Sequence, residues 1–470
     1  MERKRKFLSK LPKVDETLRD QRLFEFFEDT PRELIVESVR EIIKEEREDI
    51  LRSCGQDLSF DEDRFMERIC DLIKKKRQLS LRQVVNATGV TLHTNLGRAV
   101  LSSSACSNII RVAKGYSNLE YNIKKGARGS RHSHVESMIC RITGAEAAMV
   151  VNNNAAATML CLSTLAEGRE VIVSRGELVE IGGSFRIPDI MEQSGARLIE
   201  AGTTNKTKAS DYHDAISEDT AALLKVHTSN YRIIGFTAEV SIEELASIAK
   251  EKGIPVIYDM GSGLIVDLSR YGIKEPTVSD GLRAGADVIL FSGDKLMGGP
   301  QAGIIAGKKE YINRMKKHPL ARAFRIDKLT LAALEATMRE YLDPEKAMRE
   351  IPTLRMLTED KGAMERRGRE LVKKLEPMEL YRGEVAPATE QAGGGSAPAT
   401  ELEGICVKLK SDVPAEKTER LLRKCEVPVI ARIVKDEICL DMRTVSDDDI
   451  ELICGALEYA ERELSGRYGE

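Results

Sequence analysis

The chain has 470 residues, of which 42% are hydrophobic and 31% are charged, a balance typical of proteins that bury a substantial core. This length predicts two to four domains. The net charge of −4 gives no sign of a polyanionic partner, although a local basic face would still allow nucleic-acid binding. With no Trp and only 4% aromatic residues, a dense base-stacking platform is not expected.

The cysteines and histidines do not follow the spacing of a metal site. The nine cysteines never form a C-x-x-C pair, and of the six histidines only His132 and His134 lie close together, a pair that fits a polar loop better than a ligand pair. We therefore expect no metal. The basic stretch Met1–Lys13 is not followed by an apolar segment, and no apolar run is long enough to span a membrane. These features predict a cytoplasmic protein with reduced thiols.

Residues 1–78 are expected to form a helical N-terminal domain. Apolar residues recur at helical spacing over Glu33–Ile50 and again over Arg64–Ile73, with Ser59 or Asp61 as candidate caps of the second helix. Charges in this region nearly balance. A helical appendage used for assembly is therefore the simplest interpretation, with nucleic-acid binding as the alternative.

Residues 79–345 are expected to contain a linker and a large α/β domain. Helical patterns such as Ala155–Ala166 and Ile242–Lys250 alternate with short apolar strands. The expected strands are Ala148–Val151, Val171–Val173, Arg197–Glu200, Ala221–Val226, Val256–Tyr258, Val288–Phe291 and Gly303–Ala306. This alternation predicts a doubly wound parallel sheet covered on both faces. Ligands bind such sheets at the carboxyl ends of the strands.

Residues 346–470 are expected to form a smaller α+β domain. A long helix is predicted near Leu354–Leu375, and the segment Val385–Thr400, rich in Ala, Gly, Pro and Thr, is predicted to be a loop, with "QAGGGSAPAT" (391–400) as its mobile part. The elements expected after it are strands at Ile405–Leu409, Val429–Ile433 and Ile438–Asp441, and a helix at Lys417–Cys425.

Three segments that follow predicted strands carry polar residues suited to ligand binding. Asn153 and Asn154 begin a helix whose free N–H groups suit a phosphate, although on this segment alone a helix cap is the simpler explanation. Asp259 would pair with a cationic ring nitrogen, hold a metal or act as a cap. Lys295 lies in a Ser/Gly turn, either as a crowded nucleophile or as a solvent-facing lysine.

The order of these segments favours one cofactor. A helix start, then a strand-end Asp, then a strand-end Lys 36 residues later supply what pyridoxal phosphate (PLP) requires. Its phosphate needs a helix N-terminus, its pyridinium nitrogen a carboxylate and its aldehyde an amine. The sequence therefore predicts a PLP enzyme with Lys295 as the cofactor lysine.

The sequence resembles the bacterial selenocysteine synthase family, the L-seryl-tRNA(Sec) selenium transferases, over essentially its whole length. The likeness runs through "VVNATGVTLHTNLGRAVLS", "YSNLEYNIKKGARGSRHSHVE", "VVNNNAAA", "KVHTSNYRIIGFT", "YDMGSG", "SGDKLMGGPQAG" and "PLARAFRIDKLTLAALEATM". It implies a fold-type-I PLP-dependent transferase with a mainly parallel central sheet, a smaller C-terminal α+β domain and a helical N-terminal domain. The Gly/Ala-rich "ATEQAGGGSAPATE" is a departure that affects the small domain only.

The resemblance also implies roles for individual residues. Lys295 would carry PLP as a Schiff base, with Asp294 as a proton-handling or orienting partner and Asp259 on the pyridine nitrogen. The remaining cofactor contacts would come from Asn153, Asn154 and Ser292 at the phosphate and from His227 and Arg131 at the wall of the site. For His227, a hydrogen-bonded strand-end histidine without a further role is an equally good interpretation.

Three arginines would bind the selenium donor, selenophosphate: Arg98, Arg322 and Arg325. Guanidinium groups suit phosphate oxyanions. Without the resemblance, Arg322 and Arg325 would be taken for a surface pair at helical spacing.

The function that the resemblance implies is conversion of L-seryl-tRNA(Sec) to L-selenocysteinyl-tRNA(Sec) through a PLP-bound aminoacrylate. It further implies tRNA recognition by the N-terminal domain and a homodecamer built as a pentamer of dimers, with active sites at the dimer interfaces. Two alternatives stay open. One is a PLP lyase or transferase acting on a small amino acid or amino sugar, and the other is a non-catalytic RNA-binding scaffold on the same fold.

Overall fold

The computed structural model describes residues 8–52, 60–181, 185–229, 231, 233–394 and 401–468. It divides into two compact units, Met1–Gln83 and Val84–Glu470. Within the described ranges, no helix combines the length and apolar character needed to cross a bilayer.

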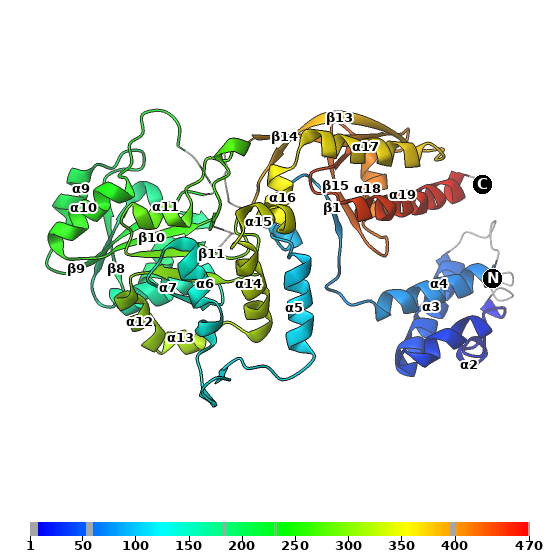
Figure 1. Cartoon of the computed structure of the whole chain (residues 1–470). Helices are drawn as coiled ribbons and strands as arrows, with labels where there is room; N and C mark the ends of the chain where they lie inside the picture. The colour runs from blue at the N-terminus through cyan, green and yellow to red at the C-terminus, as the bar shows by residue number, and fades with distance from the viewer. Residues whose placement is uncertain are drawn as a thin grey trace. The chain divides into compact units, whose positions relative to one another are not determined.

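The first unit is helical, as predicted (Figure 1). Its elements are α2 (Val14–Thr17), the 3₁₀ helix η1 (Gln21–Glu28), α3 (Arg32–Arg52) and α4 (Glu62–Arg77). Apolar side chains of η1, α3 and α4, among them Leu23, Val39 and Ile69, form one buried core. Asp61 caps α4 by accepting from the backbone N–H groups of its first turn, whereas Ser59 lies outside the described residues.

The second unit is built around a seven-stranded sheet with the order β4-β12-β11-β10-β9-β5-β8. Its strands are β4 (Ala147–Val151), β5 (Glu170–Ser174), β8 (Arg197–Ala201), β9 (Thr220–Val226), β10 (Val256–Gly261), β11 (Val288–Ser292) and β12 (Gly303–Gly307). Every strand predicted in this region is present. The direction of one strand departs from the parallel pattern, in agreement with the mainly parallel sheet that the resemblance implies. β12 follows β11 after a short turn, so it pairs antiparallel with both β11 and β4, and the sheet is mainly parallel.

Helices cover both faces of this sheet (Figure 1). Alternate side chains of β4 enter different cores: Ala148 and Val150 pack with α6, α11 and α14, whereas Met149 and Val151 pack with α7, α8 and α12. The helices of this part are α5 (Ser103–Ala113), α6 (Glu136–Thr143), α7 (Asn154–Leu165), α8 (Ile187–Gln193), α9 (Ala209–Ala215), α10 (Ile242–Lys252), α11 (Val278–Arg283), α12 (Lys309–Lys317), α13 (Leu320–Ala323), α14 (Lys328–Glu340) and α15 (Pro344–Glu350).

The shorter elements of the second unit lie in its connections. They are the 3₁₀ helices η2 (Thr94–Leu96), η3 (Arg131–His134), η4 (Arg175–Glu177) and η5 (Ser269–Tyr271), and the paired short strands β2 (Tyr121–Asn122) with β3 (Ala127–Arg128) and β6 (Glu180–Ile181) with β7 (Phe185–Arg186).

A five-stranded sheet, β1-β15-β16-β14-β13, forms the C-terminal part of this unit. Its strands are β1 (Val85–Ala87), β13 (Arg382–Gln391), β14 (Glu401–Lys410), β15 (Val429–Val434) and β16 (Glu437–Asp441). Its helices are α16 (Pro352–Thr358), α17 (Lys361–Leu375), α18 (Ala415–Leu422) and α19 (Asp447–Tyr468). β1 pairs parallel with β15, so a strand far upstream in the sequence completes this sheet.

Two expectations for this part were wrong. The single long helix is two helices, because Glu359 is extended and the Asp360 side chain caps α17. The segment predicted as a loop from Val385 begins as strand β13, which pairs antiparallel with β14 along its whole length. Alternating side chains and ladder pairing outweigh the low strand preference of its Ala, Gly and Pro residues. Residues 395–400 lie outside the described residues.

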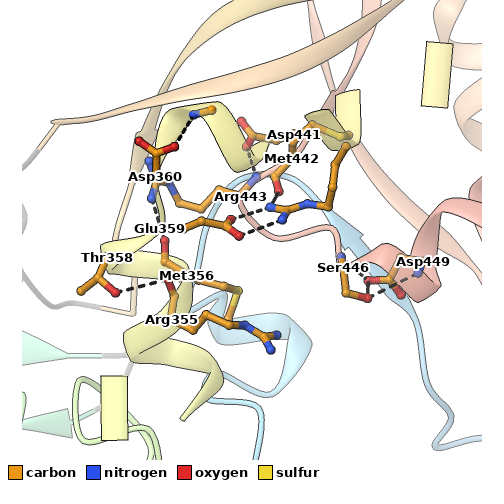
Figure 2. A network of polar contacts seen from close by, with 12 residues as sticks. Arg355, Met356, Thr358, Glu359, Asp360, Asp441, Met442, Arg443, Ser446 and Asp449 are labelled. Atoms are coloured by element: carbon orange, nitrogen blue, oxygen red, sulfur yellow. Dashed lines mark hydrogen bonds and ion pairs between the residues drawn. The ribbon is translucent and has the colours of Figure 1, made fainter. Parts of the chain in front are cut away.

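Buried charges connect α16 to the C-terminal sheet, as Figure 2 shows around Arg443. Arg443 donates from Nη1 to the Met356 carbonyl oxygen and from Nη2 to the Glu403 carbonyl oxygen, each at 2.6 Å, and its Nε contacts the Glu390 carboxylate. Asp441, fully buried, accepts a hydrogen bond from the Arg443 backbone N–H. This network fixes α16 against β13, β14 and the end of β16.

Candidate active site

A cavity of about 290 Å³ lies where β9, β10 and β11 end and α7 begins. This is the edge at which open α/β sheets bind ligands. The predicted site residues that line it are Arg98, Asn153, Asn154, His227, Asp259, Ser292, Asp294 and Lys295.

Asp259 is buried near the end of β10 and is held by α7. Its Oδ1 accepts a hydrogen bond of 2.8 Å from Asn154 Nδ2, and its Oδ2 accepts one of 2.9 Å from Thr158 Oγ1. Burial raises the pKa of Asp259, and these two hydrogen bonds act against that rise. The sequence reading missed Thr158. Its place four residues after Asn154, on the same helix face, is the signal that was available.

Lys295 is also buried, 4% exposed, and its surroundings disfavour the charged amine. Burial lowers the pKa of Lys295, and the Arg98 cation acts in the same direction, whereas Asp259 and Asp294 oppose it. A Cβ atom at Gly261 would lie 3.8 Å from Lys295 Nζ, so the amine reaches the end of β10. Lys295 is therefore buried and crowded, and it does not face the solvent.

Arg98 and Asp294 form an ion pair beside this lysine. Arg98 Nη1 lies 2.9 Å from Asp294 Oδ2, and the Ala99 N–H donates to the Asp294 carbonyl oxygen at 3.3 Å. Arg98 has a φ of 64°, a left-handed conformation that is uncommon for a residue with a side chain. The Arg98 side chain and the backbone of the next residue, Ala99, thus both contact the lysine-bearing turn.

The start of α7 combines a helix cap with unpaired polar groups. The Asn153 side chain accepts from the Ala156 N–H at 2.8 Å, which is the capping arrangement. A Cβ atom at Gly303 of β12 would lie 2.1 Å from the Asn153 carbonyl oxygen, so only glycine allows this approach. Asn154 Oδ1 and Ser229 Oγ are buried without a hydrogen-bond partner among the described residues. Such groups suit a polar ligand in the cavity.

His227 lies directly after β9, next to Asp259. Its backbone N–H donates to the Asp259 carbonyl oxygen at 2.9 Å, and its ring Nε2 lies 2.6 Å from Glu275 Oε2. The ring is thus hydrogen-bonded, and it also lines the cavity. Glu275 was not found from the sequence, because it lies 48 residues away in a connection without a motif.

Three predicted residues lie outside this cavity in their own chain. Arg131 is buried but donates to Glu120 Oε1, at 3.0 Å from Nε and 2.6 Å from Nη2, and to the Ile326 carbonyl oxygen. Arg325 Nη1 lies 3.7 Å from the same Glu120 oxygen, and Arg322 is exposed on α13. The structure thus brings Arg98 to Lys295 but not Arg131, Arg322 or Arg325.

The cavity residues fit PLP. A buried amine, a buried carboxylate that hydrogen bonds hold in place, and the N-terminus of α7 lie around one space. These are the groups that the aldehyde, the ring nitrogen and the phosphate of this cofactor require. Within the described ranges, no group of three or more His, Cys, Asp or Glu side chains could hold a metal ion.

The fold of this chain is similar to that of a solved structure. D-Glucosaminate-6-phosphate ammonia-lyase superposes with a TM-score of 0.57 over 83% of this chain and 98% of the lyase, at 21% identity. This likeness concerns the fold alone. The predicted fold class, a fold-type-I PLP-dependent transferase with a mainly parallel sheet, a smaller C-terminal α+β part and a helical N-terminus, is confirmed.

Comparisons of sequence identify the family. The L-seryl-tRNA selenium transferase model matches residues 84–446, and the model of the selenocysteine synthase N-terminus matches residues 8–47. The L-seryl-tRNA(Sec) selenium transferase of Clostridium botulinum strain Okra is 49% identical, with 96% of this chain and 98% of that protein covered. Those of Clostridium perfringens strain 13 and Alkaliphilus oremlandii are 48% and 47% identical, with 97% and 96% of this chain and 98% of each relative covered. The chain therefore belongs to the L-seryl-tRNA selenium transferase family, as its sequence predicted.

Proposed function

We propose that the chain converts L-seryl-tRNA(Sec) to L-selenocysteinyl-tRNA(Sec) with PLP as cofactor and selenophosphate as selenium donor. The observation that carries this proposal is the convergence of Lys295, Asp259 and the start of α7 on one cavity. Family membership supports the reaction, and the cavity supports the cofactor.

When bound, PLP supplies an electron sink for bond changes at the α- and β-carbons of the seryl group. Lys295 would hold the cofactor covalently. The Asp259 carboxylate would hold the proton on the ring nitrogen, and the hydrogen bonds from Asn154 and Thr158 favour its charged form against burial, which raises its pKa. The start of α7, at Asn153 and Asn154, would bind the phosphate through N–H groups, and Ser292 would bind it through its hydroxyl.

The amine of Lys295 would also move the substrate's α-proton. A base must be neutral before it accepts a proton, and burial with the Arg98 cation favours the neutral amine by lowering the pKa of Lys295. Asp294 holds Arg98 in place through the 2.9 Å ion pair and would orient this exchange. His227 forms part of the wall.

The selenium donor would bind through arginine. Arg98 lines the cavity, so its guanidinium is available to an oxyanion there. Arg322 and Arg325 lie outside the cavity of their own chain. We assign them to the donor site of a neighbouring copy in a homodecamer with sites between copies, and place Arg131 with Glu120 as support for Arg325.

The helical unit would recognise the tRNA. Its basic end, Lys74–Arg77, closes α4, but Lys76 is paired with Glu41 and Arg77 with Asp29. Recognition would therefore use the surface shape of the unit as well as its charge. Because the proposed substrate is an aminoacylated tRNA, the cytoplasm is the expected compartment.

One spectroscopic experiment tests the cofactor assignment. The purified full-length protein should show a PLP absorbance band that borohydride removes, with the pyridoxyl label on Lys295 in the peptide map. Lys295→Ala should lack both the band and the formation of selenocysteinyl-tRNA. A Lys295→Ala protein with full activity, or a wild-type protein that cannot be reconstituted with PLP, would contradict the proposal.

A further inference from the structure

A second cavity, of about 660 Å³, lies beside the first, and His227 lines both. It is bounded by residues that follow β5, β8 and β9, so it continues the ligand-binding edge of the sheet. Its wall includes Ser174 from the end of β5 and Thr207 from the connection after β8. It is also larger than the first cavity, so the two spaces are suited to different parts of one substrate.

The wall of the second cavity is polar and carries charges of both signs. Hydroxyl and amide groups come from Thr204, Asn205, Thr207, Thr228 and Thr237. Lysines 206 and 274 are accompanied by glutamates 239, 275 and 401. A site for a phosphate group alone would not gather carboxylates. Carboxylate oxygens instead accept hydrogen bonds from the exocyclic amines of adenine and cytosine, and hydroxyl and amide groups suit a ribose.

The two connections that contribute Asn205 and Thr237 to the wall are hydrogen-bonded to each other next to an exposed aromatic residue, Phe236. Asn205 Nδ2 donates to the Phe236 carbonyl oxygen at 2.6 Å, and the Ala238 N–H donates to the Asn205 carbonyl oxygen at 3.0 Å. Phe236 is nevertheless 87% exposed. Lys206 Nζ lies 5.7 Å from the centre of its ring. An exposed aromatic ring beside an ammonium is the pairing that stacks a base and attracts the backbone of single-stranded RNA.

The reaction requires a nucleoside at this place. The seryl group of the substrate is esterified to the ribose of the last nucleotide, so that ribose must lie next to the cavity in which the serine reacts. The second cavity meets this condition because it shares the wall residue His227 with the cavity around Lys295 and Asp259. We propose that it binds the 3′-terminal nucleoside of the aminoacyl-tRNA, with Phe236 stacking on a base of the single-stranded end. This inference rests on the proposed function.

Photo-crosslinking tests the location. Seryl-tRNA(Sec) carrying 8-azidoadenosine as its last nucleotide would be irradiated with the PLP-loaded full-length enzyme, and the modified peptides mapped. We expect labels on residues 203–207 or 233–239. A label confined to other segments, in an enzyme that still turns over this tRNA, would overturn this inference alone. Absence of turnover with unmodified seryl-tRNA(Sec) would instead overturn the proposed function.

A pair of variants tests the stacking contact. Phe236→Ala should raise the KM for seryl-tRNA(Sec) at least about fivefold, the lower end of what one stacked base contributes. Its kcat at saturating tRNA and its PLP spectrum should match the wild type. Tyr116→Ala, which removes an even more exposed aromatic side chain outside both cavities, should leave KM unchanged. An unchanged KM for Phe236→Ala would overturn the proposal. So would a changed molecular mass by light scattering, because Phe236 would then be a contact between copies.

Discussion

Arg98 Nη1 lies 2.9 Å from Oδ2 of Asp294, the residue directly before Lys295, and their opposite charges shift the pKa of Lys295 in opposite directions. Burial lowers the pKa of Lys295 most, the Arg98 cation adds to this effect, and Asp294 opposes it. The ion pair therefore has two consequences: it holds Arg98 in the cavity wall, and its two charges adjust the pKa of the neighbouring Lys295 amine.

Replacing Arg98 should move the pH dependence of cofactor binding. Only the neutral amine of Lys295 attacks the PLP aldehyde, so reconstitution of cofactor-free protein speeds up as pH rises through the Lys295 pKa. Arg98→Ala removes a cation that lowers this pKa and leaves Asp294 unpaired, and both changes raise it. The midpoint should therefore move to higher pH. Stopped-flow absorbance measures it, Arg98→Lys is the charge-preserving control, and an unchanged midpoint in Arg98→Ala would refute the tuning.

Thr158 should matter for cofactor affinity, although no role for it was predicted from the sequence. Thr158→Val removes one of the two side-chain hydrogen bonds that oppose the raised pKa of Asp259. A hydrogen bond to a charged group contributes about 1.5–3 kcal/mol, so we expect PLP affinity to fall roughly tenfold or more. Thr164→Val is the matched control, because the Thr164 hydroxyl on the same helix donates to the Leu160 carbonyl oxygen. Equal PLP titration curves for the two variants would contradict this role.

The strands and their polar ends could be predicted because both are local properties. Short apolar runs indicated the strands, and Asp259 and Lys295 follow from the rule that parallel strands present their carboxyl ends at one edge. The antiparallel direction of β12 was missed, because an apolar run looks the same in either direction. The strand at Val385 was missed because its pairing with β14 outweighs its composition.

The partners of the site residues could not be predicted, because they are tertiary contacts. Glu275 contacts His227, which lies 48 residues away in the sequence, and Glu120 contacts both Arg131 and Arg325, which belong to two different segments. No rule of sequence spacing predicts such contacts. For Arg131, the resemblance suggested a place in the cavity wall. Within this chain its guanidinium instead donates hydrogen bonds to the Glu120 carboxylate and to the Ile326 carbonyl oxygen.

The buried Glu390 should make the stability of the protein depend on pH. Burial raises the pKa of Glu390, and Asp441 beside it acts in the same direction, against the opposing effect of Arg443. The folded state therefore binds this proton more tightly than the unfolded state, whose pKa is near 4.5. The stability that it contributes is complete below that value and is lost as pH rises toward the folded pKa.

Glu390→Gln tests this linkage, because the amide keeps the shape without the titration. Its Tm should fall less than that of the wild type between pH 5 and pH 8, read by differential scanning fluorimetry at about 0.15 M salt to limit surface effects. Glu403→Gln, an exposed neighbour on β14, should keep the wild-type slope. Parallel Tm curves for Glu390→Gln and the wild type would show that Glu390 does not carry the dependence.

Lys225 and Glu177 form a buried ion pair beneath the second cavity, and breaking it should cost stability and tRNA affinity together. Lys225 Nζ lies 2.7 Å from Glu177 Oε1 and 3.3 Å from Glu239 Oε2 on the rim, and Glu177 Oε2 accepts the Val226 N–H at 2.9 Å. Lys225→Met leaves the buried Glu177 without its counter-charge, which costs about 3–5 kcal/mol.

The double variant Lys225→Met with Glu177→Gln should recover part of that loss, because no unpaired charge is then left buried. A urea titration would show the single variant unfolding earliest and the double variant between it and the wild type. Arg339→Met, which breaks the exposed pair with Glu335, should remain within about 0.5 kcal/mol of the wild type. In both Lys225 variants Glu239 loses its cationic partner, so the KM for seryl-tRNA(Sec) should rise even where stability is recovered. If KM in the double variant returned toward the wild-type value together with stability, the charge of Lys225 would have no role in the nucleoside site.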